Sequence, residues 1–281
     1  MPATPPEALS EAAQAIGRAK ALVITAGAGM GVDSGLPDFR GDEGFWNAYP
    51  PYRALGLSFA DLANPQWFSS DPALAWGFYG HRLNLYRATT PHDGFQLLRA
   101  WAAAMPFGAF VFTSNVDGQF QRAGFVEDRI VEVYGSIHHA QCTEPCGERI
   151  ESATSIHVRV NDAFRAEEPL PRCARCGELL RPNILMFGDG GWLAARTEAQ
   201  QRRFGRWLAT LPDAPGDVVI VELGAGTAVP TVRLTSELLA RRSNGALLRI
   251  NVREPEGPPG TLGIALGAAA ALRRIDAGLR R

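Results

Sequence analysis

Two pairs of cysteines are the most specific chemical feature of this sequence. Cys142 and Cys146 are separated by three residues, Cys173 and Cys176 by two, and 26 residues lie between the pairs. Four thiolates at this spacing suit one tetrahedral zinc ion, and an all-sulfur set predicts a closed structural site, because a catalytic zinc keeps one position open. Disulfides suit a long chain with no signal-like start less well. Four buried free thiols are the alternative.

A glycine-rich segment, AGAGMGVDSGLPDFRG, begins within the apolar run ALVITAGAG. Gly27 and Gly29 could let the backbone approach a pyrophosphate. The third glycine of a dinucleotide fingerprint would fall on Val32, so the fingerprint is not met, and a purely steric need for glycine is the alternative. Residues 37–40 then place a rigid turn, a carboxylate, an aromatic ring and a cation directly beyond a strand end. This segment is therefore a candidate ligand-binding loop.

These residues need a framework, and the apolar runs indicate one. Strands covered by helices on both faces read as four or more apolar residues with little alternation. The predicted strands are residues 21–29, 107–115, 129–135, 217–224 and 246–251. Helical periodicity lies between them, in residues 91–104, 197–211 and 231–242. This order predicts an α/β fold with a Rossmann-like, doubly wound parallel sheet, whose ligands bind beyond the carboxyl ends of the strands.

Two segments break this alternation and predict a smaller domain inserted into the larger one. Residues 45–87 are aromatic and proline-rich, and residues 136–181 carry the cysteines. We expect these two segments to form a small helical and zinc-binding domain. The Rossmann-like domain is expected to comprise residues 1–44, 88–135 and 182–281. The alanine-rich tail, residues 262–279, is predicted to be a closing helix.

Charge and composition exclude some classes of function. The chain has 281 residues and a formal net charge of -1, which leaves no basic surplus for a nucleic-acid backbone or an anionic membrane. No stretch approaches the roughly 18 apolar residues of a membrane span, and the start lacks the features of a signal peptide. We therefore expect a cytoplasmic protein without direct nucleic-acid or membrane partners. The oligomeric state is left open.

Several further motifs follow in a fixed order along the chain. They are TSNVDGQFQRAG, the YGS before the cysteines, RPNILMFGD, the turn in LGAGT and the late INVRE. Together with the glycine-rich segment they resemble the ordered signature set of the sirtuins, the NAD-dependent protein lysine deacylases. The resemblance extends over about residues 20–255. It implies NAD as co-substrate, bound between an NAD-binding Rossmann-like domain and a small domain with one structural zinc, and an acyl-lysine protein or peptide as partner.

The resemblance also implies which residues bind NAD. Asn115 and Asp117 match the residues that hold the nicotinamide carboxamide, and Ser114 stands where the family usually has a glutamine that contacts a ribose. Asn251 would meet the adenine ribose, and Arg253 the region beside it. The other implied cofactor-binding residues are Ala26, Gly27, Ala28 and Gly29 at the pyrophosphate, Asp38, Phe39 and Arg40 over the nicotinamide ribose, and Gly224, Gly226 and Thr227 on the adenosine side.

The family's general base is a histidine at the end of a strand, and Tyr134 occupies that position here. A free phenol has a pKa of about 10 and a free imidazole about 6.5, so only about one phenol in a thousand is basic at neutral pH. A mismatched base loses about 10²- to 10⁴-fold, which predicts impaired late steps of deacylation with NAD binding retained. His138 and His139 follow closely, but a polar surface role suits them better than rescue. Tyr134 fits either a natural branch of the family or a deliberate inactivating replacement.

Two other motifs concern the substrate. Tyr79 and Arg82, at positions i and i+3 of a predicted helix, resemble the pair found in sirtuins that act on acidic acyl groups, because a guanidinium suits a carboxylate. Core packing of an aromatic helix and acetyl-lysine use are the alternatives. Phe187, Gly188 and Asp189 match the family's Phe-Gly-Glu loop, whose backbone pairs with the substrate peptide as an added strand.

Three functions are consistent with these features. The first is a sirtuin-type NAD-dependent protein lysine deacylase, acting on acetyl or acidic acyl groups, that produces nicotinamide and O-acyl-ADP-ribose and is impaired by Tyr134. The second is an NAD-dependent protein ADP-ribosyltransferase or NAD hydrolase, which needs cleavage of the glycosidic bond but not the later base. The third is a non-catalytic NAD or ADP-ribose binding module.

Overall fold

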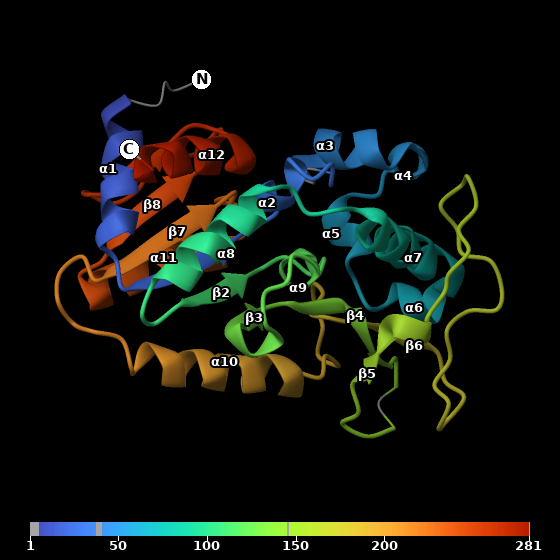
Figure 1. Cartoon of the computed structure of the whole chain (residues 1–281). Coiled ribbons are helices and arrows are strands. Elements are labelled where there is room, and N and C mark those ends of the chain that lie inside the picture. Colours follow the sequence, from blue (N-terminus) through green and yellow to red (C-terminus); the bar gives the residue numbers. More distant parts are fainter. Residues whose placement is uncertain (1–5, 38–40, 145, 281) are drawn as a thin grey trace.

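A six-stranded parallel sheet forms the centre of the larger part of the molecule (Figure 1). The computed structural model describes residues 6–37, 41–144 and 146–280. The strand order is β3-β2-β1-β7-β8-β9, and each neighbouring pair is parallel. The strands are β1 (Ala21–Ala26), β2 (Ala109–Thr113), β3 (Ile130–Glu132), β7 (Val218–Leu223), β8 (Ala246–Ile250) and β9 (Leu262–Ile264). The order reverses direction between β1 and β7, so the sheet is doubly wound, as predicted.

Helices cover both faces of this sheet. On one face α1 (Pro6–Arg18), α8 (Gly94–Ala104) and α12 (Ala268–Leu279) pack against strand residues such as Leu22 and Ile24. On the other face α10 (Ala195–Leu208) and α11 (Thr231–Ser243) pack against the residues that alternate with these, such as Val23. Every residue of β1 and β7 is buried, which explains why both strands are largely apolar, with only Thr25 and Glu222 as polar exceptions.

The smaller lobe combines helices with a three-stranded antiparallel sheet. Its sheet has the order β5-β4-β6, and an aromatic cluster fills the space between this sheet and the helices. Its helices are α3 (Gly41–Ala48), α4 (Pro50–Ala54), α5 (Phe59–Leu62), α6 (Trp67–Ser70) and α7 (Pro72–Ala88), and its strands are β4 (Gly135–Cys142), β5 (Glu151–Ser152) and β6 (Leu180–Ile184). Short helical turns occur at α2 (Gly29–Val32), α9 (Gln119–Arg122), Glu127–Arg129 and Ala153–Ser155.

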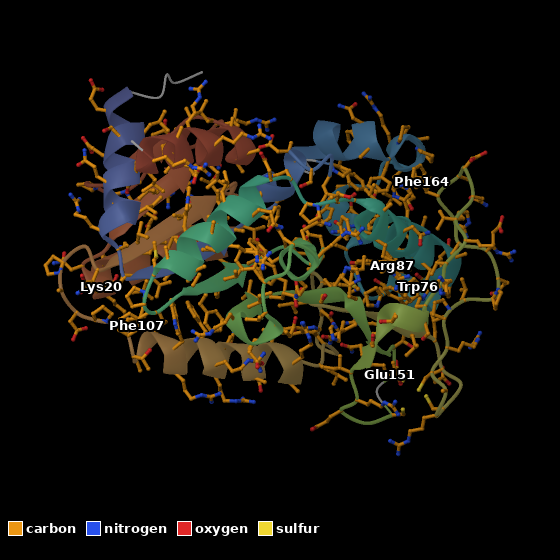
Figure 2. All side chains as sticks on the ribbon, in the orientation of Figure 1. Lys20, Trp76, Arg87, Phe107, Glu151 and Phe164 are labelled. Carbon is orange, nitrogen blue, oxygen red and sulfur yellow. The ribbon has the colours of Figure 1, made fainter. Side chains whose placement is uncertain are left out.

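Figure 2 shows how the two lobes lie along the molecule. Lys20 and Phe107 mark the amino ends of β1 and β2, and Trp76 and Phe164 lie at the opposite end, in the smaller lobe. Because all strands of the large sheet are parallel, their carboxyl ends face the smaller lobe. No helix in the described part of the chain is long and apolar enough to cross a membrane.

The predicted strands and helices of the sheet are confirmed; the strands are shorter than predicted, and the helix bounds differ by up to three residues in either direction. One prediction was wrong: residues 262–279 are not a single helix, because Leu262–Ile264 form the edge strand β9 and the helix starts only at Ala268. In the smaller lobe, β6 pairs with β4 and extends across the expected domain boundary at residue 182. The division into two domains otherwise stays a prediction.

Candidate functional site

A cavity of about 930 Å³ lies between the two lobes, at the carboxyl ends of β1, β2, β7 and β8. Helices α5 and α7 of the smaller lobe form its opposite wall. Small-molecule sites in proteins measure about 300 to 1,000 Å³, and in doubly wound sheets they sit where the strand order reverses. This cavity is therefore the candidate ligand site.

The loops after β1 and β7 pack backbone against backbone at the floor of the cavity. A Cβ on Gly27 would lie 2.8 Å from Ala225 Cα, and a Cβ on Gly224 would lie 2.4 Å from Gly29 Cα. The amide of Gly29 also donates a 3.0 Å hydrogen bond to the Gly224 carbonyl oxygen. Close packing therefore accounts for these glycines, and it also brings Gly27 and Ala28 to the cavity surface.

The loop after β2 carries three polar residues into the cavity, namely Ser114, Asn115 and Asp117. The Thr113 hydroxyl oxygen accepts the backbone N–H of Asn115 at 3.0 Å. The side-chain amide of Asn115 donates to the Gly27 carbonyl oxygen, also at 3.0 Å. The polar loop and the glycine loop are thus joined directly, and Asn115 has a fixed position.

Asp117 is a buried carboxyl in the cavity wall. Its Oδ1 accepts the backbone N–H of Gln119 at 2.9 Å. Burial raises the pKa of Asp117 to about 6; this hydrogen bond opposes the shift, the Glu132 carboxylate adds to it, and the Arg82 cation opposes it. Near neutral pH this carboxyl can therefore exist in both states, accepting hydrogen bonds when ionised and also donating one when protonated.

Tyr134 lies at the junction of β3 and β4, and its side chain lines the cavity. Its hydroxyl shares a hydrogen bond of 2.6 Å with the hydroxyl of Thr231, the first residue of α11. Its carbonyl oxygen accepts the N–H of Leu185 at 3.0 Å. Hydrogen bonds therefore hold Tyr134 at both its backbone carbonyl oxygen and its side-chain hydroxyl.

The two neighbouring histidines are half-buried, so the predicted surface role is wrong. The Nε2 atom of His138 lies 2.9 Å from the carbonyl oxygen of Asp117, and since a carbonyl only accepts, Nε2 carries the proton. Burial lowers the pKa of His138, and it lowers the pKa of His139 to about 4. His138 therefore supports the loop that carries Asp117, and neither histidine is part of the described cavity lining.

The wall formed by α7 contains a buried cation among aromatic rings. Tyr79, Arg82 and Tyr86 line the cavity from one side of this helix. The Nε and Nη2 atoms of Arg82 donate to the Tyr86 hydroxyl at 3.0 and 2.9 Å. The guanidinium carbon also lies 5.0 Å from the Phe78 ring centre and 5.6 Å from that of Phe59, within cation–π range. The positive charge is therefore held firmly in place.

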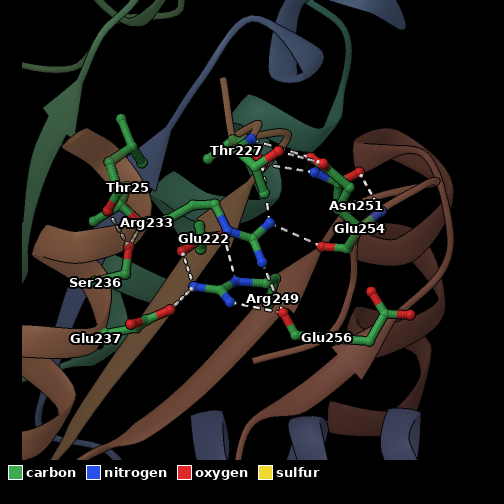
Figure 3. Close-up of polar contacts among 12 residues, drawn as sticks. Thr25, Glu222, Thr227, Arg233, Ser236, Glu237, Arg249, Asn251, Glu254 and Glu256 are labelled. Carbon is green, nitrogen blue, oxygen red and sulfur yellow. Dashed lines mark hydrogen bonds and ion pairs between the residues drawn. The ribbon is translucent and has the colours of Figure 1, made fainter. Parts of the chain in front are cut away.

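The opposite end of the cavity is formed by the loops after β7 and β8 (Figure 3). The Thr227 hydroxyl donates to Glu254 Oε1 at 2.6 Å, and the Thr227 amide donates to Oε2 at 3.2 Å. Asn251 is buried, and its Oδ1 accepts the backbone N–H groups of Arg253 and Glu254. Its Nδ2 donates to the Ala225 carbonyl oxygen at 2.7 Å. Asn251 thus links the loop after β7 to the loop after β8 without itself lining the cavity.

Buried polar contacts hold the conformation of the turn after β6. The side chains of Arg181 and Asp189 form a buried ion pair with two hydrogen bonds. The Asp189 carboxylate also accepts the backbone N–H groups of Met186 and Gly191. Phe187, at the outer side of the turn, is half exposed and lines the cavity. Asp189 therefore shapes the turn, and any contact with a peptide would come from its outer residues and backbone.

The four cysteines converge at the far end of β4, away from the cavity. Cys142 Sγ lies 3.6 Å from Cys146 Sγ and 3.7 Å from Cys176 Sγ, and the Sγ atoms of Cys146 and Cys173 are 4.0 Å apart. A zinc–sulfur bond of about 2.3 Å gives a tetrahedron with edges of about 3.8 Å. The arrangement fits one zinc ion held by four thiolates, as the spacing predicts.

Most residues that the sequence assigned to ligand binding lie around the one cavity. Those in its lining are Gly27, Ala28, Tyr79, Arg82, Ser114, Asn115, Asp117, Tyr134, Phe187, Gly224, Gly226, Thr227 and Arg253. Outside the lining lie Ala26, Gly29, Gly188, Asp189 and Asn251. The predictions for residues 38–40 fall outside the described residues.

Sequence reasoning missed four polar residues of the site, one of which is Ser58, the N-cap residue of α5. Tyr86 lies at i+4 from Arg82, a spacing that places two side chains on one helix face. Glu254 closes the INVRE motif, where an acidic residue beyond a strand end is typical of nucleotide-binding sheets. Thr231 touches Tyr134 only through the tertiary fold, and no local pattern could have indicated it.

Comparison with known proteins agrees with this architecture. The Sir2 family model matches residues 27–201. The NAD-dependent protein deacylase of Aeropyrum pernix is 32% identical over 248 residues, which cover 87% of this chain and 86% of that protein. NAD-dependent protein deacylase 2 of Pyrobaculum aerophilum is 33% identical over 231 residues, covering 82% and 79%.

Solved structures of Sir2 homologues have the same fold as this chain. A Sir2 homologue in complex with ADP-ribose superposes with a TM-score of 0.71 at 27% identity, covering 96% of both chains. A Sir2 homologue in complex with NAD gives a TM-score of 0.67 at 26% identity, covering 96% of this chain and 94% of that one. With the family model matching more than half of its residues, relatives above 30% identity over most of its length and the same overall fold, this chain belongs to the Sir2 family.

Proposed function

We propose that this protein is a sirtuin-type NAD-dependent protein lysine deacylase, which releases nicotinamide and transfers a lysine acyl group to ADP-ribose. The observation that carries the proposal is a single cavity at the switch point of the sheet, with the buried Asp117 carboxyl at one end and the Thr227–Glu254 pair at the other. Relatives of this chain are named NAD-dependent protein deacylases, and solved homologues hold NAD or ADP-ribose.

When bound, NAD supplies the glycosidic bond whose cleavage activates the ribose toward the acyl oxygen. In this proposal Asn115 and Asp117 hold the nicotinamide carboxamide, which has one carbonyl acceptor and two N–H donors. Asp117 suits either group, because its raised pKa gives access to both of its protonation states. The fixed Asn115 side chain and the joined loops after β1 and β2 keep this end of the cavity rigid, which favours positioning of the reacting bond.

In this proposal Tyr134 limits the rate of deacylation. A ribose hydroxyl must lose a proton to a base in a late step, and a phenol suits that task less well than the imidazole that the family carries there. Its hydrogen bond to Thr231 keeps the ring in place, so the cavity stays filled while the base is weak. We infer that the late step is slowed by about 10²- to 10⁴-fold relative to a histidine at this position.

The acyl group is proposed to enter along α7, and the peptide along the turn after β6. Arg82 and Tyr79 line the cavity from α7, and the fixed positive charge of Arg82 favours an acidic acyl group over acetyl. The exposed Phe187 and the backbone of its turn are proposed to pair with the substrate peptide as an added strand. Zinc, held by the four cysteines, keeps the smaller lobe folded and takes no part in the chemistry.

A second candidate function is favoured by Tyr134 itself. Protein ADP-ribosyl transfer and NAD hydrolysis need cleavage of the glycosidic bond but not the later base, so a tyrosine would hinder them less. Protein-bound ADP-ribose, detected by mass spectrometry and lost in Asn115→Ala, would select this function. A cytoplasmic location stays a prediction from the sequence.

The decisive experiment compares the given chain with Tyr134→His. Nicotinamide release and lysine product are measured separately on acetyl- and succinyl-lysine peptides with NAD. We expect the given chain to release or exchange nicotinamide while forming little deacylated product, and Tyr134→His to raise product formation by about 10²- to 10⁴-fold. Equal deacylation by both forms would contradict the role given to Tyr134. Binding of NAD without nicotinamide release from either form would instead indicate a non-catalytic NAD-binding module.

A further inference from the structure

The histidine that precedes α8 is bonded to the segment that follows β1. This segment, residues 27–37, supplies four residues of the cavity lining, two at each end. Between these ends, His92 Nε2 lies 3.1 Å from the Met30 carbonyl oxygen, and the His92 backbone N–H donates to the Ser34 hydroxyl oxygen at 3.0 Å. Figure 1 shows α2, which contains Met30, beside the amino end of α8. His92 itself is outside the described lining, so it can act on the cavity only through this segment.

The two ring contacts define the protonation state of His92. A carbonyl oxygen only accepts hydrogen bonds, so Nε2 carries a proton and donates it to Met30. Nδ1 accepts the backbone N–H of Gly94 at 3.0 Å, so Nδ1 carries no proton. A Cβ on Gly94 would lie 2.6 Å from His92 Cε1, so the ring fits there because residue 94 has no side chain. The ring is therefore neutral, and it joins the first turn of α8 to the segment.

The surroundings of the ring favour this neutral form. His92 is half-buried, and burial lowers its pKa; its hydrogen bond to the segment and the carboxylates of Asp33 and Asp93 oppose the shift, and the Arg273 cation of α12 adds to it. Both carboxylates have other partners. Asp33 accepts the backbone N–H of Ala269 at 2.8 Å, and Asp93 lies 2.6 Å from Arg273 Nε. Near neutral pH the ring is therefore uncharged.

We propose that neutral His92 is a positioning residue for the proposed reaction: it holds residues 27–37 in the conformation that binds the dinucleotide, and protonation of its ring releases them. This inference deepens the proposed function, because it takes NAD or its ADP-ribose part as the ligand. A protonated ring carries a hydrogen on Nδ1, which would face the N–H of Gly94, and two donors cannot bond. The ring must then move away from Gly94, which also breaks its contact with Met30. Acid conditions should therefore weaken ligand binding through a residue that does not touch the ligand.

The direct test follows the His92 ring by NMR in the full chain, with and without saturating ADP-ribose. The chain has five histidines, and the spectrum of His92→Gln identifies the signal of His92. We expect the ring to carry its proton on Nε2 alone at pH 7.5. Because proton binding and ligand binding are linked reciprocally, ADP-ribose should lower the pKa of His92 further. An unchanged pKa, or a proton on Nδ1 alone, would show that the inference is wrong, and the ADP-ribose bound in the same sample would leave the proposed function standing.

Two amide variants separate the two contacts of the ring. The Nε2 atom of glutamine can replace the donor to Met30, the Oδ1 atom of asparagine can replace the acceptor for Gly94, and neither amide titrates. Calorimetry at pH 7.5 should show that His92→Gln keeps most of the affinity for ADP-ribose, whereas His92→Asn binds about three- to tenfold more weakly, the effect of one lost hydrogen bond. As the pH falls through the measured pKa of His92, the affinity should fall more steeply in the given chain than in His92→Gln. ADP-ribose lacks nicotinamide, the proposed partner of Asp117, so the titration of Asp117 affects both proteins alike.

His157→Gln is the matched control. His157 is exposed, lies in the smaller lobe and is outside the described cavity lining, and the substitution is the same. It should leave both the affinity for ADP-ribose and its pH profile unchanged. If His92→Asn binds as tightly as the given chain, or if the given chain and His92→Gln have the same pH profile, the inference is wrong while the proposed function stands. If the given chain binds neither NAD nor ADP-ribose, the proposed function fails, and the inference fails with it.

Discussion

The two lobes of this molecule are stabilised in different ways. The large sheet has a mainly aliphatic core, with Ile24 and Val221 among its fully buried residues, and each strand pairs with a neighbour along its length. The smaller lobe buries many aromatic and polar side chains, including Tyr49 and Trp76, around a short sheet. Its shape depends on a few specific points, namely the four cysteines and the Arg181–Asp189 pair. We therefore expect single substitutions to destabilise the large sheet, whose stability comes from many contacts, less than the smaller lobe, whose stability depends on a few residues.

Removal of zinc should give the largest difference in stability between the two lobes. Binding to a four-cysteine site contributes on the order of 10 kcal/mol or more to a zinc-dependent fold. We therefore expect a strong chelator, or Cys173→Ser, to unfold the smaller lobe and abolish activity while the parallel sheet keeps its secondary structure. Hydrogen exchange followed segment by segment would check this. Equal loss of protection in β1 and β4 would show that the lobes fold as one unit.

The second largest effect is expected at the two buried arginine–carboxylate pairs, one in each lobe. Asp189→Ala leaves Arg181 buried without its charged partner and with only a long hydrogen bond to the Ile184 carbonyl oxygen, which typically costs 3 to 5 kcal/mol, so we expect a loss of about that size. Glu222→Ala in the sheet should cost less, because Arg249 keeps Glu237 and the Glu256 carbonyl oxygen as partners. Urea unfolding of both variants gives the comparison. A larger loss of unfolding free energy for Glu222→Ala than for Asp189→Ala would contradict the view that the smaller lobe depends more on individual residues.

Asp117 should give the site a measurable dependence of stability on pH. Its folded pKa is raised from 3.8 to about 6, so the folded state binds the proton more tightly than the unfolded state. The free energy of unfolding should therefore fall as pH rises from about 4 to about 6, by up to about 3 kcal/mol, and then level off.

The variant Asp117→Asn should lack this slope and be more stable than the given chain at pH 7.5. The measurement is the difference in the free energy of unfolding between the two proteins at pH 5 and at pH 7.5. A difference that does not grow with pH would mean that the carboxyl is not held in a desolvated position.

The smallest effect is expected at an exposed helix start in the smaller lobe. Ser58 and Asp61 form a reciprocal cap at α5, where the Ser58 side chain accepts the Asp61 N–H and the Asp61 carboxylate accepts the Ser58 N–H. Ser58→Ala should cost about 1 kcal/mol. The loss should be visible as faster hydrogen exchange in α5 with little change in β1. An equal change in both segments would contradict a local role.

The same contrast explains what the sequence could predict. The strands of the large sheet are apolar runs buried on both faces, and this local signal was enough to place five of them. The strands β4, β5 and β6 were missed, because their pattern mixes polar residues, cysteines and a bulge between Ser136 and Ala140. The edge strand β9 was assigned to a helix because it has only three residues and precedes an alanine-rich segment.

In the site, the predictable residues were those carried by local motifs. Asn115, Asp117, Tyr134 and Thr227 lie around one cavity because the carboxyl ends of parallel strands meet at one edge. What could not be predicted depends on contacts between distant segments. The Tyr134–Thr231 hydrogen bond joins residues 97 positions apart, and the inward orientation of Asp189 follows from Arg181 on the preceding strand.

The turn between Met186 and Gly191 has separate inner and outer surfaces. Arg181 and Asp189 hold its frame, whereas Phe187 and the glycines at 188 and 190 face outward. A Cβ added at either glycine would meet no other atom within 4 Å, although Gly188 has a positive φ that favours glycine. Side chains at positions 187 and 190 can therefore vary with little loss of folding, whereas position 188 is tied to glycine by its backbone, so the outer surface of this turn can change while the cavity behind it is kept.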